Sequence, residues 1–411
     1  MGQRTGSADL PLHGGRVPAW LAVRMARLGR VLIEALILEH GRPEVLRRLA
    51  HPFWFQSLGC VMGMDWHSSG ITTSVLGALK RGLAPVADEL GLYVCGGRGR
   101  VSRQTPDELL AVGERTGVDG AALARQSRLV AKVDSAAVQD GFELYLHGFI
   151  VAADGSWTVV QQGMNGGLGT ARRYHWLSEG LHSFVEEPHA AIEGAPVLAT
   201  TIMNLTDRRA ARARAAQVAL VREGPDRVLR ELPRLVMPEH HDVRRKDVLL
   251  RRLHGALAAA RERGPVDFQD VLMTPGVGAR TVAALAAVAE VVYGAPSRFT
   301  DPARFALAHG GKDGHPFPVP LRVYDRTIAL MRRAVDEAKL GNDERLAAVR
   351  RLDAEARRLE RWASGPSFDE HVAEERRQSH RYGGMTVSGP ARPPPPEARQ
   401  LELPLERTGA R

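Results

Sequence analysis

Two aspartates and a histidine near the middle of the chain have side chains that could bind a metal ion and act on a phosphate ester. Asp134 and Asp140 are predicted to end a strand, and His147 lies in the next β-favouring segment. Gln161 or Gln162 can join them from the strand after that. Two carboxylates and an imidazole can hold Mg²⁺ or Mn²⁺ and orient a water molecule. The alternative is that Asp140 and Asp154 only build turns and that His147 lies on a solvated face.

Segments 129–138, 142–151 and 157–163 must position these side chains, and each is predicted to be a strand. The pairs Asp140-Gly141 and Asp154-Gly155 between them are typical of hairpin turns. The sequence therefore predicts an antiparallel meander. Alternation along the second strand places Leu144, Leu146, Gly148 and Ile150 on one face, and Tyr145, His147 and Phe149 on the other.

The turn Gly276-Val277-Gly278, before an Ala-rich segment predicted to be a helix over 279–293, is the best candidate for an anion site. Glycines tolerate positive φ angles and leave room for an approaching surface. The helix that follows offers unpaired N–H groups and the positive end of its dipole. The pattern resembles the helix-hairpin-helix motif of DNA-repair and DNA-processing proteins, which grips a phosphate through this backbone. An ordinary tight turn is the alternative.

Within that resemblance, Val277 is predicted to anchor the turn in the core, and Arg280 and Thr281 are predicted to contact phosphate. Glycosylases of the helix-hairpin-helix class carry a catalytic aspartate after the helix that follows the turn, which is close to the position of Asp301. Position 279 is alanine, so the turn lacks the lysine that forms a Schiff base in the bifunctional members. Lys312, in the long loop predicted over 294–320, could stabilise charge on a reacting phosphate.

Two further segments combine residues that suit nucleic-acid contact. Arg172 and Arg173 precede three aromatic side chains, a mixture that suits backbone contact and base stacking. Glycines alternate with arginines over residues 96–100, a pattern that can lie close to phosphates but lacks the lysine and Ser/Thr of a Walker A loop.

A further polar cluster precedes the helix expected after residue 69 and contains Asp65, His67, Ser68 and Ser69. This cluster could hold a metal ion, or Ser69 could cap the helix.

The chain of 411 residues has an excess of nine positive charges and a pI near 10.0, which favours acidic partners and DNA first. Its two cysteines exclude a disulfide framework and a thiolate zinc site, so a cytoplasmic location is expected. No segment is typical of a membrane span.

The predicted fold class is α+β, with a strand-rich N-terminal part, a helical part and a tail. The expected divisions are an irregular arm over 1–18, an α+β candidate catalytic domain over 19–200, a helical DNA-binding domain over 205–364 with the helix-hairpin-helix at 266–293, and a disordered tail over 365–411. Helices are expected at 206–222, 225–235, 242–262, 266–273, 279–293, 321–339 and 342–363.

Near the end of the tail, one short peptide resembles the segment by which bacterial polymerases and repair proteins bind the sliding clamp. Its anchors would be Gln400, Leu401, Leu403 and Leu405, which fit small apolar pockets once the tail orders on binding. The sliding clamp is therefore an expected partner.

Several long strings, spread from about residue 4 to 363, are similar to the bacterial and archaeal domain-of-unknown-function family 763. They include TGSADLPLHGG, SLGCVMGMDWHSSG, VDSAAVQDGFELYLHGFI, VVQQGMN, PGVGARTVAALA and FALAHGGKDGHPFPVP. That resemblance identifies related proteins, but it implies no particular activity. The residues themselves favour a DNA-binding protein of repair or replication-linked processing that is a metal-dependent nuclease. The alternatives are a helix-hairpin-helix glycosylase and a non-catalytic adaptor that docks on the clamp.

Overall fold

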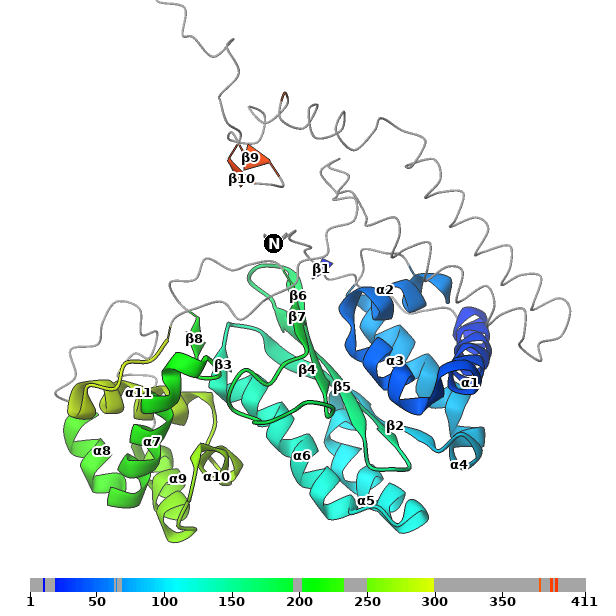
Figure 1. Cartoon of the computed structure of the whole chain (residues 1–411). Helices are drawn as coiled ribbons and strands as arrows, with labels where there is room; N and C mark the ends of the chain where they lie inside the picture. Colours follow the sequence, from blue (N-terminus) through cyan, green and yellow to red (C-terminus); the bar gives the residue numbers. More distant parts are fainter. Residues whose placement is uncertain are drawn as a thin grey trace, which may run out of the picture.

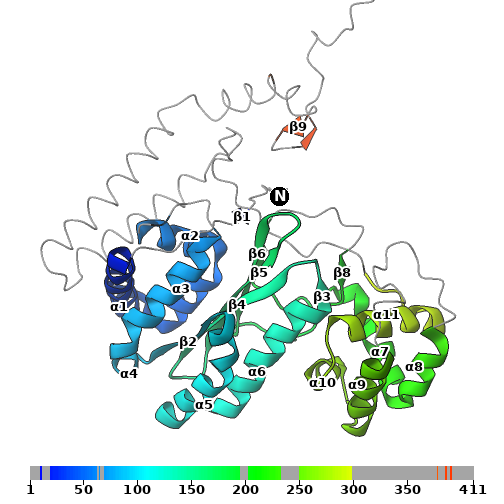
Figure 2. The same cartoon turned by 180° about the vertical axis from the view of Figure 1, so that it is seen from behind.

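The computed structural model describes residues 10–11, 19–62, 64, 69–194, 202–232 and 250–298, together with residue 377 and the pairs 385–386 and 389–390. A mostly antiparallel sheet with helices on both faces lies beside a group of helices, so the fold is mixed α+β (Figures 1 and 2). None of the helices in these ranges is long and apolar enough to cross a membrane.

A six-stranded antiparallel sheet forms the centre of the N-terminal part. Its order is β1 (Leu10–Pro11), β6 (Thr170–Leu177), β5 (Trp157–Asn165), β4 (Glu143–Ala152) and β2 (Leu92–Arg98), with β7 (Ala191–Glu193) also paired to β6. Two of the three strands of the predicted meander are confirmed as the antiparallel pair β4 and β5, whereas the third strand of the observed meander is β6 and not segment 129–138. The hairpin at Asp154-Gly155 is also confirmed, because Gly155 has a φ of 86° and its N–H donates to Ala152 O at 2.9 Å.

Helices cover both faces of this sheet (Figure 1). One face packs against α1 (Ala19–Ala50), α2 (Pro52–Val61) and α3 (Gly70–Leu83), while the short α4 (Ala87–Leu90) leads into β2. The other face packs against α5 (Thr105–Thr116) and α6 (Gly120–Lys132). Segment α1 consists of two helices joined by a kink at Gly41, where φ is 79°.

The alternation predicted along β4 holds for most of the strand and fails near its start. Leu146 and Ile150 lie in the core under α1–α3, and Phe149 lies in the core under α5 and α6, as expected. Leu144 and Tyr145 have exchanged faces, since Leu144 packs with the α5–α6 core and Tyr145 with the other. The β4–β5 register shifts between Leu144 and Leu146, and such a bulge reverses the side-chain alternation.

The expected strand over residues 129–138 is wrong. Helix α6 continues to Lys132, and a π-helix, η3 (Val133–Ala137), follows it; only β3 (Val138–Gln139) is extended, paired with β8 (Met203–Asn204). Leu129, Val130 and Val133 are buried at helical spacing, so the apolar residues that resembled a strand form one face of a helix. Asp119 caps its start by accepting from Ala122 N at 2.8 Å.

The helical part follows the predicted positions in the residues described, and α11 has the predicted bounds. It contains η5 (Arg208–Ala210), α7 (Ala211–Glu223), α8 (Pro225–Glu231), α9 (Leu250–Glu262), α10 (Phe268–Met273) and α11 (Ala279–Tyr293). Its apolar core is continuous with the core under α5 and α6, so the two parts share one interior. The predicted helices over 321–339 and 342–363 lie outside the described residues.

Candidate functional site

The turn between α10 and α11, residues 274–278, presents backbone at the surface while holding its apolar residue inside. Val277 is 1% exposed and belongs to the core, whereas Pro275 and Gly276 are exposed. Gly276 adopts a φ of 85°, which favours glycine, and Val277 N donates to Thr274 O at 3.1 Å. The predicted anchoring of the turn by Val277 is therefore confirmed. We call this segment the α10–α11 turn.

Helix α11 begins directly at this turn without a capping side chain at its N-cap residue. That residue is Gly278, which is extended with a φ of −142°. A Cβ added at Gly278 would meet nothing within 4 Å, so the space beside the first turn of the helix is open. Of the two residues expected to reach phosphate, Arg280 is exposed and Thr281 is buried. The start of this fifteen-residue helix thus offers backbone N–H groups and a partial positive charge.

The turn is fastened to the sheet part by two side chains that flank η3. Lys132 Nζ donates to Val277 O, and burial lowers the pKa of this lysine. Gln139 Nε2 donates to Ala279 O at 2.8 Å and to Ala136 O at 2.9 Å. Because both contacts reach backbone carbonyls on either side of Gly278, they fix the position of the start of α11.

Cationic side chains lie around the α10–α11 turn. Arg128 is exposed on α6, one turn before Lys132 on the same helix. Arg252 is exposed on α9, one turn before Ala256, whose Cβ lies 3.5 Å from a Cβ built on Gly276. Together with the exposed Arg280, they place three cationic side chains near the turn, on α6, α9 and α11.

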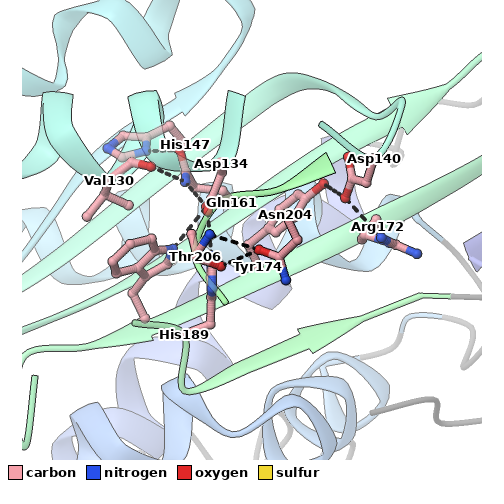
Figure 3. A network of polar contacts seen from close by, with 11 residues as sticks. Val130, Asp134, Asp140, His147, Gln161, Arg172, Tyr174, His189, Asn204 and Thr206 are labelled. Carbon is pink, nitrogen blue, oxygen red and sulfur yellow. Dashed lines mark hydrogen bonds and ion pairs between the residues drawn. The ribbon is translucent and has the colours of Figure 1, made fainter. Parts of the chain in front are cut away.

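Asp134, by contrast, is fully buried within the sheet part (Figure 3). The π-helix η3 turns its side chain toward β5 and β6. Its Oδ2 accepts from Trp176 Nε1 at 2.9 Å and from Gln161 Nε2, and its Oδ1 contacts His189 Nε2. Three donors thus surround this carboxylate.

His147 is buried between two neutral partners. Its Nε2 lies 2.9 Å from Ser127 Oγ on α6, and its Nδ1 lies 2.7 Å from Gln161 Oε1. Because Gln161 Oε1 can only accept, the imidazole carries its proton on Nδ1 and accepts from Ser127. Burial lowers the pKa of His147, which keeps the ring neutral.

Asp140 lies farther along the same face of the sheet, with a separate set of partners (Figure 3). Its Oδ2 accepts from Arg172 Nη1 at 2.9 Å and from Tyr174 Oη at 2.7 Å, and its Oδ1 accepts from Phe142 N at 3.2 Å. Burial raises the pKa of Asp140, and Arg172 opposes that shift. A buried carboxylate and a buried guanidinium therefore compensate each other.

The three residues expected to bind a metal do not converge. They share one face of the sheet, but each is saturated by other side chains, as Figure 3 shows. Within the part of the chain that the structure describes, no group of three or more His, Cys, Asp or Glu side chains could hold a metal ion. This arrangement suits a structural network better than a metal centre.

Arg172 and Arg173 do not fit the predicted contact with DNA, because both side chains are fully buried. Neighbouring residues on a strand point to opposite faces, and each arginine meets a carboxylate on its own side. Arg173 pairs with Glu193 on the α2 side of the sheet and donates from Nη2 to Gln56 Oε1 at 2.9 Å. Their charges stabilise the interior and are not available at the surface.

Several predicted site residues lie outside the described residues. They are Asp65, His67, Ser68, Asp301, Lys312, Gln400, Leu401, Leu403 and Leu405. In contrast, Ser127 and His189 join the buried network without any local pattern that singled them out. Each lies far in sequence from its partner, so only the pairing of the sheet and helices brings them together.

The family model described as protein of unknown function (DUF763) matches residues 6–319. A search of curated proteins found no significant match. A search of solved structures found none either. The family match spans most of the chain and includes the sheet, the buried network and the α10–α11 turn. The chain therefore belongs to the DUF763 family.

Proposed function

We propose that this protein binds the phosphate backbone of DNA through the α10–α11 turn. The observation that carries the proposal is the open backbone at Gly278, with Val277 anchored below it and the uncapped start of α11 beside it. Backbone N–H groups at a helix start attract anions, and a glycine lets a phosphate approach them closely. Both features support a helix-hairpin-helix type of contact.

The surroundings of the turn favour a polyanion over a small free anion. Arg128, Arg252 and Arg280 are exposed on three different helices, α6, α9 and α11. A nucleic-acid strand carries phosphates at regular spacing and can contact several cations at once. The excess of nine positive charges over the chain agrees with such a partner.

Cleavage by Asp134, Asp140 and His147 is not part of this proposal. Each of these side chains is at most 6% exposed and already has protein partners. A base-removing reaction at Asp301 and clamp binding by the tail depend on residues outside the described ranges, so both stay predictions.

The test measures the affinity of the full chain for a fluorescent DNA duplex of about 25 base pairs by anisotropy. Gly278→Val places a branched side chain where a phosphate would approach, and the extended φ at this position accepts it. A hydrogen bond to a charged group contributes about 1.5–3 kcal/mol, so we expect a loss of about tenfold or more.

Gly166→Val is the matched control, because Gly166, like Gly278, has no positive φ and has open space around its Cβ position. It should leave the affinity for the duplex unchanged. Equal affinity of Gly278→Val and the native protein would overturn the proposal.

A further inference from the structure

A second cationic surface lies at the end of the edge strand β2. The strand ends at Arg98, and the 3-10 helix η2 (Gly99–Gln104) leads from it into α5. Arg98, Arg100 and Arg103 are all exposed on this segment. No carboxylate among the described residues pairs with any of them, and Arg98 instead lies over the Tyr145 ring at 5.7 Å from its centroid. We call residues 96–104 the arginine loop.

The backbone of the arginine loop is held by half-buried polar contacts. Glu108 accepts from Gly96 N at 2.6 Å and from Lys80 Nζ at 2.7 and 2.8 Å, while Lys80 Nζ also donates to Gly96 O at 2.8 Å. A Cβ at Gly96 would lie 2.2 Å from His147 O, so the loop approaches β4 more closely than any other residue would allow.

Hydrogen bonds within the loop hold its second half in the same way. Ser102 Oγ donates to Gly99 O at 2.6 Å, and Thr105 Oγ1 donates to Ser102 O at 2.8 Å. The loop is therefore ordered before any ligand arrives, and binding costs little further backbone entropy.

Three guanidinium groups within six residues repel one another unless an anion lies between them. Each guanidinium presents a planar set of donors that matches the oxygens of a phosphate. Glu108, on the first turn of α5, pairs with Lys80 rather than with an arginine of the loop. The arrangement keeps the three charges available at the surface.

The arginine loop and the α10–α11 turn both adjoin the α5–α6 layer. Gly97 is paired with His147, and His147 Nε2 lies 2.9 Å from Ser127 Oγ on α6. Lys132, farther along α6 by roughly 7.5 Å, donates to the carbonyl of Val277 in the turn. Helix α6 thus contacts both β4, the strand beside the arginine loop, and the α10–α11 turn itself.

We propose that the arginine loop is a second contact for the phosphate backbone of the DNA that the α10–α11 turn holds. This inference rests on the proposed function, and it assigns phosphate contact to Arg100 and Arg103, with Arg98 beside them against Tyr145. A polyanion gains from binding both surfaces at once, because the second contact becomes intramolecular.

The test removes two charges from the loop with Arg100→Ala/Arg103→Ala and keeps Arg98 on Tyr145. The matched control is Arg81→Ala/Arg230→Ala, which also removes two exposed arginines. Arg81 lies on α3, on the other side of the sheet, and Arg230 lies on α8. Affinity for the same duplex of about 25 base pairs is measured over a series of salt concentrations.

We expect the loop variant to bind roughly tenfold more weakly and to lower the slope of log K against log salt by about 1.8, which is two phosphate contacts at 0.9 each. The control should keep the native slope. A native slope and affinity in the loop variant would overturn the inference, and self-association of that variant at unchanged affinity would assign the arginines to protection of the β2 edge instead.

Combination with Gly278→Val separates this inference from the proposed function. If both surfaces contact one duplex, the triple variant should lose the product of the two separate fold-changes, since the sites are distant. If only Gly278→Val weakens binding of the duplex, the proposed function stands and the arginine loop is not a DNA contact. If only the loop variant weakens binding, the arginine loop contacts DNA and the proposed contact at the α10–α11 turn is wrong.

Discussion

The buried polar network of the sheet and the α10–α11 turn differ in what surrounds their polar groups. The network contains the residue types that most suggest catalysis, but Asp134, Asp140 and His147 are buried and bonded to other side chains. The turn contains almost no reactive side chain, but its backbone at Gly276 is exposed and the space beside Gly278 is open. The comparison teaches that availability to a ligand, rather than residue type, separates the two regions.

The two regions are also connected. Lys132 and Gln139 bond to the carbonyls on either side of Gly278. Lys132 stands immediately before the π-helix η3, which carries Asp134, and Gln139 lies in β3, which follows it. A saturated network makes that segment rigid, and a rigid segment holds the turn in place. We therefore expect the network to affect stability strongly and DNA binding only through the position of the turn.

The largest expected effect is on stability and comes from Asp140→Ala. It leaves the Arg172 guanidinium buried without its carboxylate, which should lower the free energy of unfolding by about 3–5 kcal/mol. Urea denaturation measures this change, with the exposed Asp107→Ala as a control that should change stability much less. A stable Asp140→Ala protein that had lost an activity on DNA would return this residue to a catalytic role.

The next effect is a loss of stability in weak acid. Burial lowers the pKa of both His147 and His175 below the ordinary value of 6.5, so the unfolded chain takes up protons that the folded chain does not. Stability should therefore be full above pH 6.5 and should fall below it, by up to about 1.4 kcal/mol per pH unit for each histidine.

Urea denaturation at several pH values between about 7.5 and 5.5 checks this, with His147→Gln as the comparison. Glutamine can both donate and accept, and the variant retains every other titrating group. The difference between the two proteins therefore isolates His147. Identical pH profiles would show that this histidine is protonated equally in both states.

The smallest effects concern the contacts that hold the turn. Lys132→Met keeps the aliphatic stem but removes the hydrogen bond to Val277 O, so stability should fall by about 1 kcal/mol. DNA affinity should fall several-fold because the start of α11 is less well positioned, and Lys132→Arg should restore most of it. If Lys132→Arg bound as weakly as Lys132→Met, the hydrogen bond would have no positioning role.

The sequence could predict features whose causes are local. The antiparallel pair β4 and β5, the Asp154-Gly155 hairpin and the burial of Val277 each follow from spacing and turn chemistry within a few residues. The strand expected over 129–138 was wrong because buried apolar residues suit a strand or a helix equally over short runs. The bulge after Leu144 likewise has no marker in the sequence.

The partners of the polar side chains could not be predicted, because they come from distant segments. Asp134 meets Trp176 and His189, and Arg172 meets Asp140, only after the sheet has formed. A buried carboxylate with three donors and a catalytic carboxylate have the same sequence signal. The arrangement in space decides between them.

The most direct measurement of the central claim is photo-crosslinking of DNA to a photoreactive amino acid placed at Arg280, beside the open start of α11. The same amino acid at Arg230, on α8, serves as the control. DNA bound at the α10–α11 turn should crosslink to position 280 and not to position 230. A protein that binds the duplex with native affinity but crosslinks equally at both positions, or only at 230, would contradict the account.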